Sequence, residues 1–355
     1  MTQSKTLTNR HVWQRIFFKV LGHVTIFTVG LFFLVPAVWM FFTAFKSDKD
    51  VFRFPPTLLP YDTKYVDVNG ESYPLYNVPV DGEVRQLVVT EITEGRGTFV
   101  NPADPSEVIE VRMRHADPVL IVKFQWHNFS DAMLRGVRPG LNVNFWVYLK
   151  NSLIVAFFVI IGTLASCVPV AYGFSRIEWP GRELVFMLVL STMMLPYQVT
   201  MIPLYLLFTE TLGWGNSLLP LIVPSFFANA FDIFLLRQFF RTIPQDLLDA
   251  ARVDGASDLH ILFRVVLPLS TPILAAIAVF SFLWAWNDFL GPLLYLNNPE
   301  KFTLAIGLQD FQGQRNTAWN QLMAASVVFT LPIVVAYFFA QRTFIEGIKL
   351  TGTKG

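Results

Sequence analysis

Six long apolar runs divide the chain, and they predict its architecture. They lie at residues 16–44, 145–174, 184–208, 218–240, 265–290 and 322–344. About 20 helical residues cross the ~30 Å hydrocarbon core of a bilayer, so each run is long enough to span it. A helix pairs its backbone polar groups within one segment, whereas barrel strands alternate in units of roughly ten residues, which these runs do not. The pattern predicts an all-α integral membrane protein with six transmembrane helices.

The long segment between the first two runs has a different pattern. Residues 83–92, 107–114 and 119–126 alternate polar and apolar side chains, contain β-branched residues and are separated by Gly and Pro turn signals. Their apolar content is too high for a disordered loop. We therefore expect a small β-rich insertion at about 62–123, within an extracytoplasmic loop over 46–144.

Composition supports a membrane protein and excludes other classes. The chain has 355 residues, of which 53% are hydrophobic and 15% charged, whereas soluble domains are typically about 25% charged. The net charge of +1 leaves no concentrated basic face for nucleic acid. The single cysteine, Cys167, excludes a disulfide framework and a cysteine-based metal site. The five histidines show no ligand spacing, so we expect no metal.

Cations are distributed unevenly between the short loops, and this predicts the orientation. The segments expected inside carry Lys5, Arg10, Arg15, Lys19, Arg176, Arg182, Arg237, Arg241, Arg252, Arg264, Arg342, Lys349 and Lys354. The alternate short loops carry only Lys301 and Arg315. Because cytoplasmic loops are enriched in Lys and Arg, both termini are expected in the cytoplasm. The predicted layout is a cytoplasmic segment 1–15, a first helix 16–45, a membrane core 145–345 and a cytoplasmic tail 346–355.

Residues 237–272 form a polar segment between the fourth and fifth runs, and their local signals predict two short helices. Thr242 and Gln245 have the spacing of a capping box, with Pro in the first turn. The helix should run to about Val253 and end at Gly255, which supplies a positive φ. Ser257 is then placed to cap a second short helix.

The end of the first helix and the turn after it carry small and acidic side chains. They are Asp249, Ala250, Ala251, Asp254, Gly255 and Ala256. Small side chains let another protein's backbone approach closely, and the two carboxylates offer charge to cations on such a partner. Spacing by itself leaves open the alternative of an ordinary amphipathic cytoplasmic loop.

This segment resembles the coupling loop, called the EAA loop, of permease subunits in ABC importers. The family pattern is Glu-Ala-Ala, three residues, then Gly, and here Asp249 stands where the family usually has Glu. Further matching motifs are Asn151-Ser-Leu-Ile-Val-Ala, Ala171-Tyr-Gly-Phe-Ser-Arg176, Trp179-Pro-Gly-Arg182, Ile202-Pro-Leu-Tyr205, Ile233-Phe-Leu-Leu-Arg-Gln-Phe-Phe240, Trp286-Asn-Asp-Phe-Leu290, Gln341-Arg-Thr-Phe-Ile-Glu-Gly and Lys354-Gly355. Together they resemble the carbohydrate-uptake permeases related to the second membrane subunit of maltose importers. The resemblance covers about 16–60 and 124–355, and 61–123 has no counterpart in a typical member.

The resemblance implies a permease subunit in the bacterial inner membrane, without enzymatic activity. Such a subunit forms half of the pathway for a sugar or oligosaccharide that a solute-binding protein delivers. Its partners are a homologous second permease and two ATPase subunits, which it contacts through the loop at 242–264. ATP and Mg belong to those partners, and this chain is expected to bind no cofactor. Residues 347–354 lack the Gly-Lys-[Ser/Thr] order of a phosphate loop.

Several polar and aromatic residues in the predicted spans are candidates for the sugar pathway. They are Trp284, Trp286, Asn287, Asp288, Asn229, Asp232, Tyr197 and Gln198. Ionisable groups inside a membrane often serve function, amides and carboxylates bond hydroxyls, and an indole covers the apolar face of a sugar. The alternative is structural, because Trp also anchors helices at the membrane interface.

Other functions are weaker alternatives. An integral-membrane enzyme needs a nucleophile or clustered acids, and only Asn287-Asp288 approaches that. A passive channel leaves the 242–264 loop unexplained. For the β-rich insertion, docking or gating of the solute-binding protein and a purely structural role both stay open.

Overall fold

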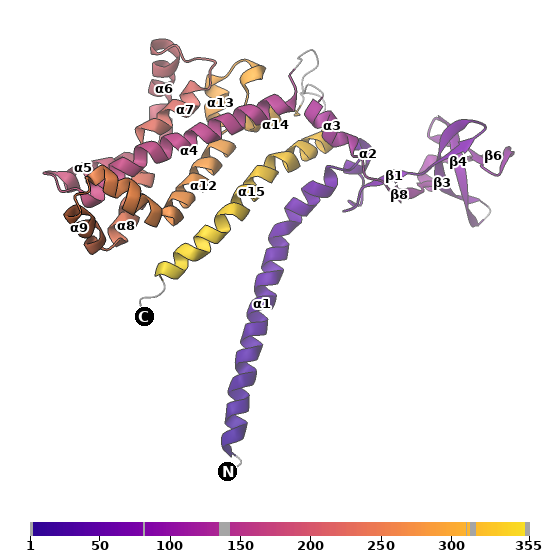
Figure 1. Ribbon diagram of the computed structural model, residues 1–355. Coiled ribbons are helices and arrows are strands. Elements are labelled where there is room, and N and C mark those ends of the chain that lie inside the picture. Colours follow the sequence, from indigo (N-terminus) through magenta and orange to yellow (C-terminus); the bar gives the residue numbers. More distant parts are fainter. Residues whose placement is uncertain (1–2, 81, 135–142, 310, 313–316, 352–355) are drawn as a thin grey trace. The chain divides into compact units, whose positions relative to one another are not determined.

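The computed structural model describes residues 3–80, 82–134, 143–309, 311–312 and 317–351, and these residues are mostly helical (Figure 1). The predicted tail residues 352–355 and part of the predicted long loop, 135–142, lie outside the described residues. The chain divides into two compact units. The first comprises Met1–Phe129 with Ala318–Val327, and the second Ser130–Thr317 with Val328–Gly355.

The first unit contains a long helix and a group of strands. Its helices are α1 (Gln3–Thr43) and α2 (Asp48–Val51), and α3 (His127–Leu134) begins at its end. Its strands are β1 (Tyr61–Thr63), β2 (Tyr65–Val68), β3 (Glu71–Val80), β4 (Glu83–Thr93), β5 (Arg96–Asn101), β6 (Asp104–Arg112), β7 (Asp117–Pro118) and β8 (Leu120–Val122). Strands β2 to β6 form an antiparallel meander in chain order, with β7 on β3. Strands β1 and β8 pair separately, Tyr61 opposite Val122, so the two ends of the strand-bearing segment lie side by side.

Turn chemistry and alternation explain the meander. Asn69-Gly70 and Glu94-Gly95 have positive φ at both positions, as the tight turns that match the twist of a hairpin require. Successive strand residues point to opposite faces. Accordingly, Leu87 and Val89 pack with Val78 and Phe99 on one face, and Val88 packs with Leu75, Val68 and Val100 on the other.

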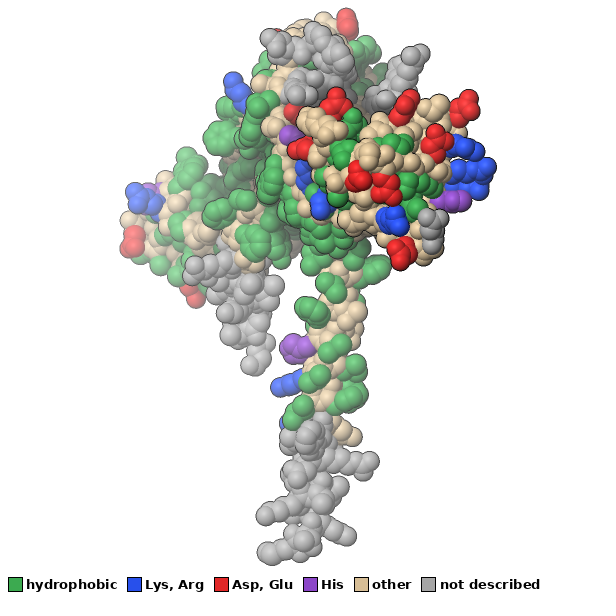
Figure 2. Space-filling view, turned by 90° about the vertical axis from the view of Figure 1, so that its right-hand side faces the viewer, with side chains coloured by type: hydrophobic (Ala, Val, Ile, Leu, Met, Phe, Trp, Pro, Cys, Tyr) green, Lys and Arg blue, Asp and Glu red, His purple; other side chains and the backbone are tan. Residues whose placement is uncertain are grey.

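Helix α1 exposes apolar side chains on all sides. None of the most apolar window of Gln14–Thr43 is buried within this chain. Figure 2 shows hydrophobic side chains along this helix, whereas charged side chains gather over the strands. A helix that is apolar all round is suited to lipid or to a partner helix, and not to water.

The second unit is a helical assembly around α4 (Phe145–Arg176). Its other elements are α5 (Arg182–Ser191), η2 (Thr192–Met194), α6 (Tyr197–Leu206), η3 (Leu207–Thr211), α7 (Leu219–Ile222), η4 (Val223–Phe227), α8 (Ala230–Thr242), α9 (Gln245–Val253), α10 (Asp258–Ile261), η5 (Leu262–Val266), α11 (Leu267–Leu269), α12 (Thr271–Asn287), α13 (Leu290–Tyr295), η6 (Pro299–Lys301) and α14 (Leu304–Gln309). Helix α15 (Trp319–Thr351) belongs to both units and continues into the predicted C-terminal tail. Helix α4 packs against α8, α12 and η4 (Figure 1).

The membrane prediction is confirmed in its general form. Four helices are long and apolar enough to cross a bilayer: Gln14–Thr43, Phe145–Arg176, Leu219–Thr242 and Trp319–Gln341. Two bent pairs raise this to as many as six: Arg182–Met194 with Tyr197–Thr211, and Asp258–Leu269 with Thr271–Asn287.

Two of the predicted runs, 184–208 and 265–290, contain these bends. The first pair is bent by 92° at Leu195, which is extended because it precedes Pro196. The second is bent by 81° at Ser270, between Pro268 and Pro272. A proline lacks an N–H and cannot continue the ladder of helical hydrogen bonds.

Candidate functional site

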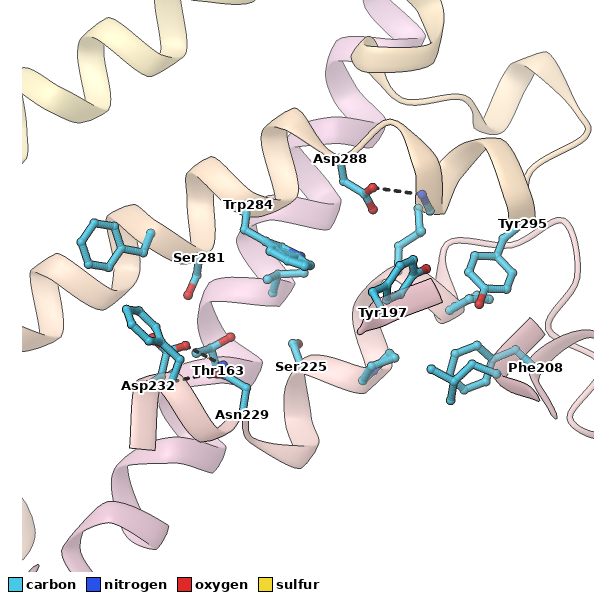
Figure 3. Close-up of a pocket in the computed structure, with 18 residues that line it drawn as sticks. Thr163, Tyr197, Phe208, Ser225, Asn229, Asp232, Ser281, Trp284, Asp288 and Tyr295 are labelled. Carbon is cyan, nitrogen blue, oxygen red and sulfur yellow. Dashed lines mark hydrogen bonds between the residues drawn. The ribbon is translucent and has the colours of Figure 1, made fainter. Parts of the chain in front are cut away.

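A cavity of about 550 Å³ lies in the second unit, between α4, α6, η4, α8, α12 and α13 (Figure 3). Its polar lining residues are Thr163, Ser225, Asn229, Asp232, Ser281 and Asp288. Aromatic side chains line it as well, among them Tyr197, Trp284 and Tyr295. The cavity therefore combines hydroxyl, amide and carboxyl groups with flat apolar surfaces.

Asn229 and Asp232 form a rigid pair at the start of α8. The Asp232 backbone N–H donates to Asn229 Oδ1 at 2.9 Å, and Asn229 Nδ2 donates to Asp232 Oδ2 at 2.6 Å. Asn229 thus satisfies a free N–H of the first helical turn and orients the carboxylate. The Asp232 side chain is buried.

The residue before this pair has an unusual backbone. Ala228 has φ 59° and ψ 161°, a region that is populated essentially by glycine and costs about 1–3 kcal/mol for other residues. Helix α4 holds it, because the Ala228 N–H donates to Ser166 Oγ at 3.1 Å. Ser166 Oγ in turn donates to the Ser225 carbonyl at 3.0 Å.

Asp288 lies on the opposite side of the cavity, directly after α12. Its Oδ1 accepts a hydrogen bond from the Gly291 N–H at 3.0 Å, drawn as a dashed line in Figure 3. Trp284, one turn earlier on α12, is 68% exposed within this chain and lies along the cavity.

The structure brings together some of the predicted pathway residues and separates others. Trp284, Asp288, Asn229, Asp232 and Tyr197 line the cavity. Trp286, Asn287 and Gln198 are not among its described lining residues. The Trp286 indole is buried and donates to the Phe329 carbonyl at 3.1 Å, so it has a structural contact instead. Asn287 Nδ2 bonds the Leu283 carbonyl of its own helix.

Sequence reasoning missed four polar lining residues: Thr163, Ser225, Ser281 and Tyr295. Single hydroxyl groups within apolar runs commonly bond the preceding helical turn, so they carry no signal of their own. Ser225, for example, also donates to the Ile222 carbonyl.

The predicted two-helix segment is present as α9 and α10. Helix α9 ends at Val253, and Gly255 has φ 81°. The Gly255 and Ala256 N–H groups bond the carbonyls of Arg252 and Ala251, which closes the helix end. Ser257 caps α10, its Oγ accepting from the His260 N–H at 3.3 Å. These local predictions are confirmed.

The predicted capping box is wrong. Pro244 occupies the N-cap position of α9, and Thr242 is still the last residue of α8. The Thr242 hydroxyl therefore donates backwards to the Phe239 carbonyl at 2.7 Å. Gln245 instead bonds Asp249 Oδ1 through its Nε2 at 3.0 Å.

The segment has a buried face and an exposed face. Leu248, Ile261, Leu262 and Val266 are buried in one cluster with α4, α5, α8 and α12. On the other side four large apolar side chains are exposed within this chain: Leu247, Val253, Leu259 and Phe263. The small residues Ala250, Ala251, Gly255 and Ala256 lie among them in sequence.

A chain of polar contacts joins the two short helices to α4. Arg252 bonds Asp249 at 3.1 Å and Asp258 at 3.5 Å, which bridges the turn at Gly255. The Tyr172 hydroxyl of α4 lies 3.5 Å from the same Asp258 oxygen. The Asp249 charge, expected to face a partner, is therefore already paired with Arg252 in this structure, whereas Asp254 is exposed at the helix end.

Arg176, the last residue of α4, connects three elements. Its Nε donates to the Phe240 carbonyl at 3.1 Å and its Nη1 to Gln245 Oε1 at 2.8 Å. Its Nη2 bonds the carbonyls of Phe240 and Ile243. One guanidinium thus satisfies carbonyls at the end of α8 and fixes the start of α9.

Residues 159–349 match the family model described as "Binding-protein-dependent transport system inner membrane component". The chain belongs to this family. The matched range contains every described lining residue of the cavity and all of α9 and α10.

Individual relatives agree with this assignment. The permease is 36% identical over 212 residues to the arabinooligosaccharides transport system permease protein AraQ of Bacillus subtilis, covering 59% of this chain and 75% of the relative. It is 35% identical over 226 residues to the sn-glycerol-3-phosphate transport system permease protein UgpE of Pectobacterium atrosepticum, covering 63% and 79%. Its fold is similar to that of a chain from the crystal structure of a bacterial ABC transporter involved in the import of the acidic polysaccharide alginate, with a TM-score of 0.64, 21% identity and coverage of 92% and 97%.

The protein is therefore a membrane-spanning permease subunit of an ATP-driven importer of the ABC type, located in the inner membrane. The family comprises transporter subunits, which favours this assignment over the alternatives of an integral-membrane enzyme or a stand-alone channel.

Proposed function

We propose that this permease forms half of the translocation pathway for a carbohydrate, and that residues 242–264 couple the pathway to ATPase subunits. The observation that carries the proposal is that α4 and α8 each extend from the cavity to the coupling segment. Thr163 of α4 and Asp232 of α8 line the cavity, whereas Arg176 and Phe240 of the same helices contact the coupling segment. At 1.5 Å per residue these points are separated by about 20 Å along α4 and about 12 Å along α8. A movement of the segment therefore reaches the cavity through two continuous helices, α4 and α8.

The exposed face of the segment is suited to docking on another protein. Val253 is 88% exposed and Leu259 67% exposed. Exposed apolar side chains next to a backbone with small side chains give a partner both area and close approach. We assign this face to an ATPase subunit, which supplies the nucleotide site with its ATP and Mg.

The cavity is suited to a carbohydrate. Its amide and carboxyl groups accept and donate hydrogen bonds to hydroxyls. Trp284 offers a flat apolar face to the C–H surface of a sugar ring. The name of one relative, the arabinooligosaccharides permease, supports a sugar or oligosaccharide as the cargo.

The proposed topology counts each bent pair as one span. Six spans with both termini in the cytoplasm place α9 and α10 inside and the strands β1 to β8 outside, as an extracytoplasmic insertion. The partners are then a homologous second permease, two ATPase subunits and a solute-binding protein that delivers the sugar.

Two sets of variants test the proposal separately. Val253→Asp and Leu259→Asp place charge on the exposed face without touching the core, and we expect the purified permease to lose its ATPase subunits. Trp284→Ala alters only the cavity, and we expect retained ATPase subunits with reduced sugar uptake. Glu110→Ala, on the exposed edge of β6, is the control for both. If the Asp variants keep their ATPase subunits, or if Trp284→Ala transports normally, the corresponding half of the proposal is refuted.

A further inference from the structure

We propose that Asp232 and Asp288 make the cavity selective against anionic carbohydrates, so that this permease transports uncharged sugars and not uronates or sugar phosphates. The inference rests on the proposed function, in which the cavity is part of the translocation pathway. It adds to that function the charge class of the cargo and the two residues that set it.

The two carboxyl groups reach the cavity from separate elements. Asp232 is on α8, is 6% exposed and is held by Asn229. Asp288 follows α12 and is held by the Gly291 N–H. Figure 3 shows them on different sides of the cavity, with Trp284 between them. Each carboxyl group has a hydrogen-bond partner that orients it at the cavity wall.

The part of the lining that the structure describes has no compensating positive charge. Among the described residues that line the cavity, none is Lys, Arg or His. An anion that enters must shed water and finds no cation to replace it, which is costly in a low-dielectric site. Ionised carboxylates add direct repulsion, and protonated carboxyls still provide no positive charge. An uncharged sugar meets neither penalty, because its hydroxyls donate to the same carboxyl and amide oxygens.

Some similar transporters are named for anionic cargoes. One relative is an sn-glycerol-3-phosphate permease, and the fold neighbour imports the acidic polysaccharide alginate. The family fold therefore does not determine the charge of the cargo. In this permease the acidic pair at positions 232 and 288 is the feature of the cavity that distinguishes charge.

The local charge can be measured without knowing the cargo. Cys167 is the only cysteine of the chain, so Cys167→Ser with Ser281→Cys gives the assembled importer's permease one thiol, facing the cavity. The probes are two methanethiosulfonate reagents of equal length, one with a trimethylammonium group and one with a sulfonate. Leu221→Cys is a second reporter in the cavity, and Val84→Cys, at a 71% exposed position on β4, is the exposed control.

The measured quantity is the ratio of the two modification rates, cationic reagent over anionic reagent. We expect this ratio to be about tenfold or more higher at the cavity thiol than at a small free thiol in solution. Adding Asp232→Asn and Asp288→Asn should bring the ratio to within about threefold of the free-thiol value, while the ratio at Val84→Cys stays unchanged. Equal rates in the cavity, or a ratio that survives both Asn substitutions, would overturn the assignment of selectivity to this pair.

A separate readout tests the pathway on which the inference rests. After complete modification of the cavity thiol, ATP-driven uptake of the transported sugar should stop. Continued uptake would refute the cavity as part of the pathway, whatever the two rates are. A lost charge preference with blocked uptake would leave the pathway intact and refute only the selectivity.

Discussion

Arg176→Ala is the sharpest test of how the coupling segment is held. The substitution removes the guanidinium that bonds the Phe240 and Ile243 carbonyls and Gln245 Oε1. The remaining bonds of α9, such as Gln245 to Asp249, lie within the segment and do not replace this link to α4. We therefore expect the segment to stay helical but to lose its fixed position relative to α4.

The size of the effect follows from the number of lost bonds. A hydrogen bond from a charged group contributes about 1.5–3 kcal/mol. Arg176 is partly exposed and water replaces some of its bonds, so we expect a net loss of about 2–4 kcal/mol at this junction. A free-energy difference of about 1.4 kcal/mol corresponds to a factor of ten in an equilibrium. Conformations in which the segment has moved away from α4 should therefore become at least about tenfold more populated relative to the docked one.

The assay is ATPase activity of the reconstituted importer, stimulated by the sugar-loaded binding protein. Arg176→Ala should lower the stimulated rate about tenfold or more while the permease stays in the membrane. Arg176→Lys should recover only part of it, because one ammonium cannot reach three acceptors in the geometry of a guanidinium. Arg182→Ala is the matched control, since the described side-chain bonds of Arg182 go to the Ile177 carbonyl and Glu183 and not to the segment. Wild-type stimulation in Arg176→Ala would refute the role of this contact.

Three further predictions concern packing, strain and the strand-bearing segment. Leu248→Ala should destabilise the permease by about 2–5 kcal/mol, measured by denaturant unfolding, because Leu248 is fully buried; Leu247→Ala, at a half-exposed neighbour, should cost far less. Ala228→Gly should stabilise by about 1 kcal/mol in the same assay, because relief of backbone strain exceeds the added entropy of the unfolded chain; a destabilised variant would mean that Ala228 is unstrained. Excising residues 62–121 with a short Gly-Ser linker should leave membrane level and basal ATPase activity unchanged, because Tyr61 already pairs with Val122; loss of the permease from the membrane would contradict this.

Local signals predicted local structure well. The end of α9 at Val253 follows from Gly255, and the start of α10 follows from Ser257, because a positive φ and a side-chain cap each act within one turn. The capping box failed for a local reason too. Thr242 is the last residue of α8 and its hydroxyl bonds the Phe239 carbonyl, whereas Pro244, which occupies the N-cap position of α9, has no side-chain oxygen to accept a hydrogen bond.

Tertiary arrangement was harder to predict. Apolar length indicates that residues 184–208 belong in a membrane, but it does not show a bend of 92°. Trp284 and Trp286 are the same residue type two positions apart, and the sequence does not distinguish them. Trp284 lines the cavity, whereas the Trp286 indole donates to the Phe329 carbonyl. The two face different ways because residues two apart on a helix lie about 200° apart around its axis, and only the packed structure shows which face meets the cavity.

The segment around Gly255 is proposed to couple this permease to ATP hydrolysis. The most direct measurement is sugar-stimulated ATPase activity and uptake of the reconstituted importer with Gly255→Asp, beside Gly255→Asn and the unmodified chain. Gly255 has φ 81° and open space around its Cα. Asn tolerates this backbone better than most residues, so Gly255→Asn separates the effect of added charge from that of strain. We expect Gly255→Asp to lose both stimulated ATPase activity and uptake with membrane level intact, and Gly255→Asn to lose less. Full retention of both activities in Gly255→Asp would contradict it.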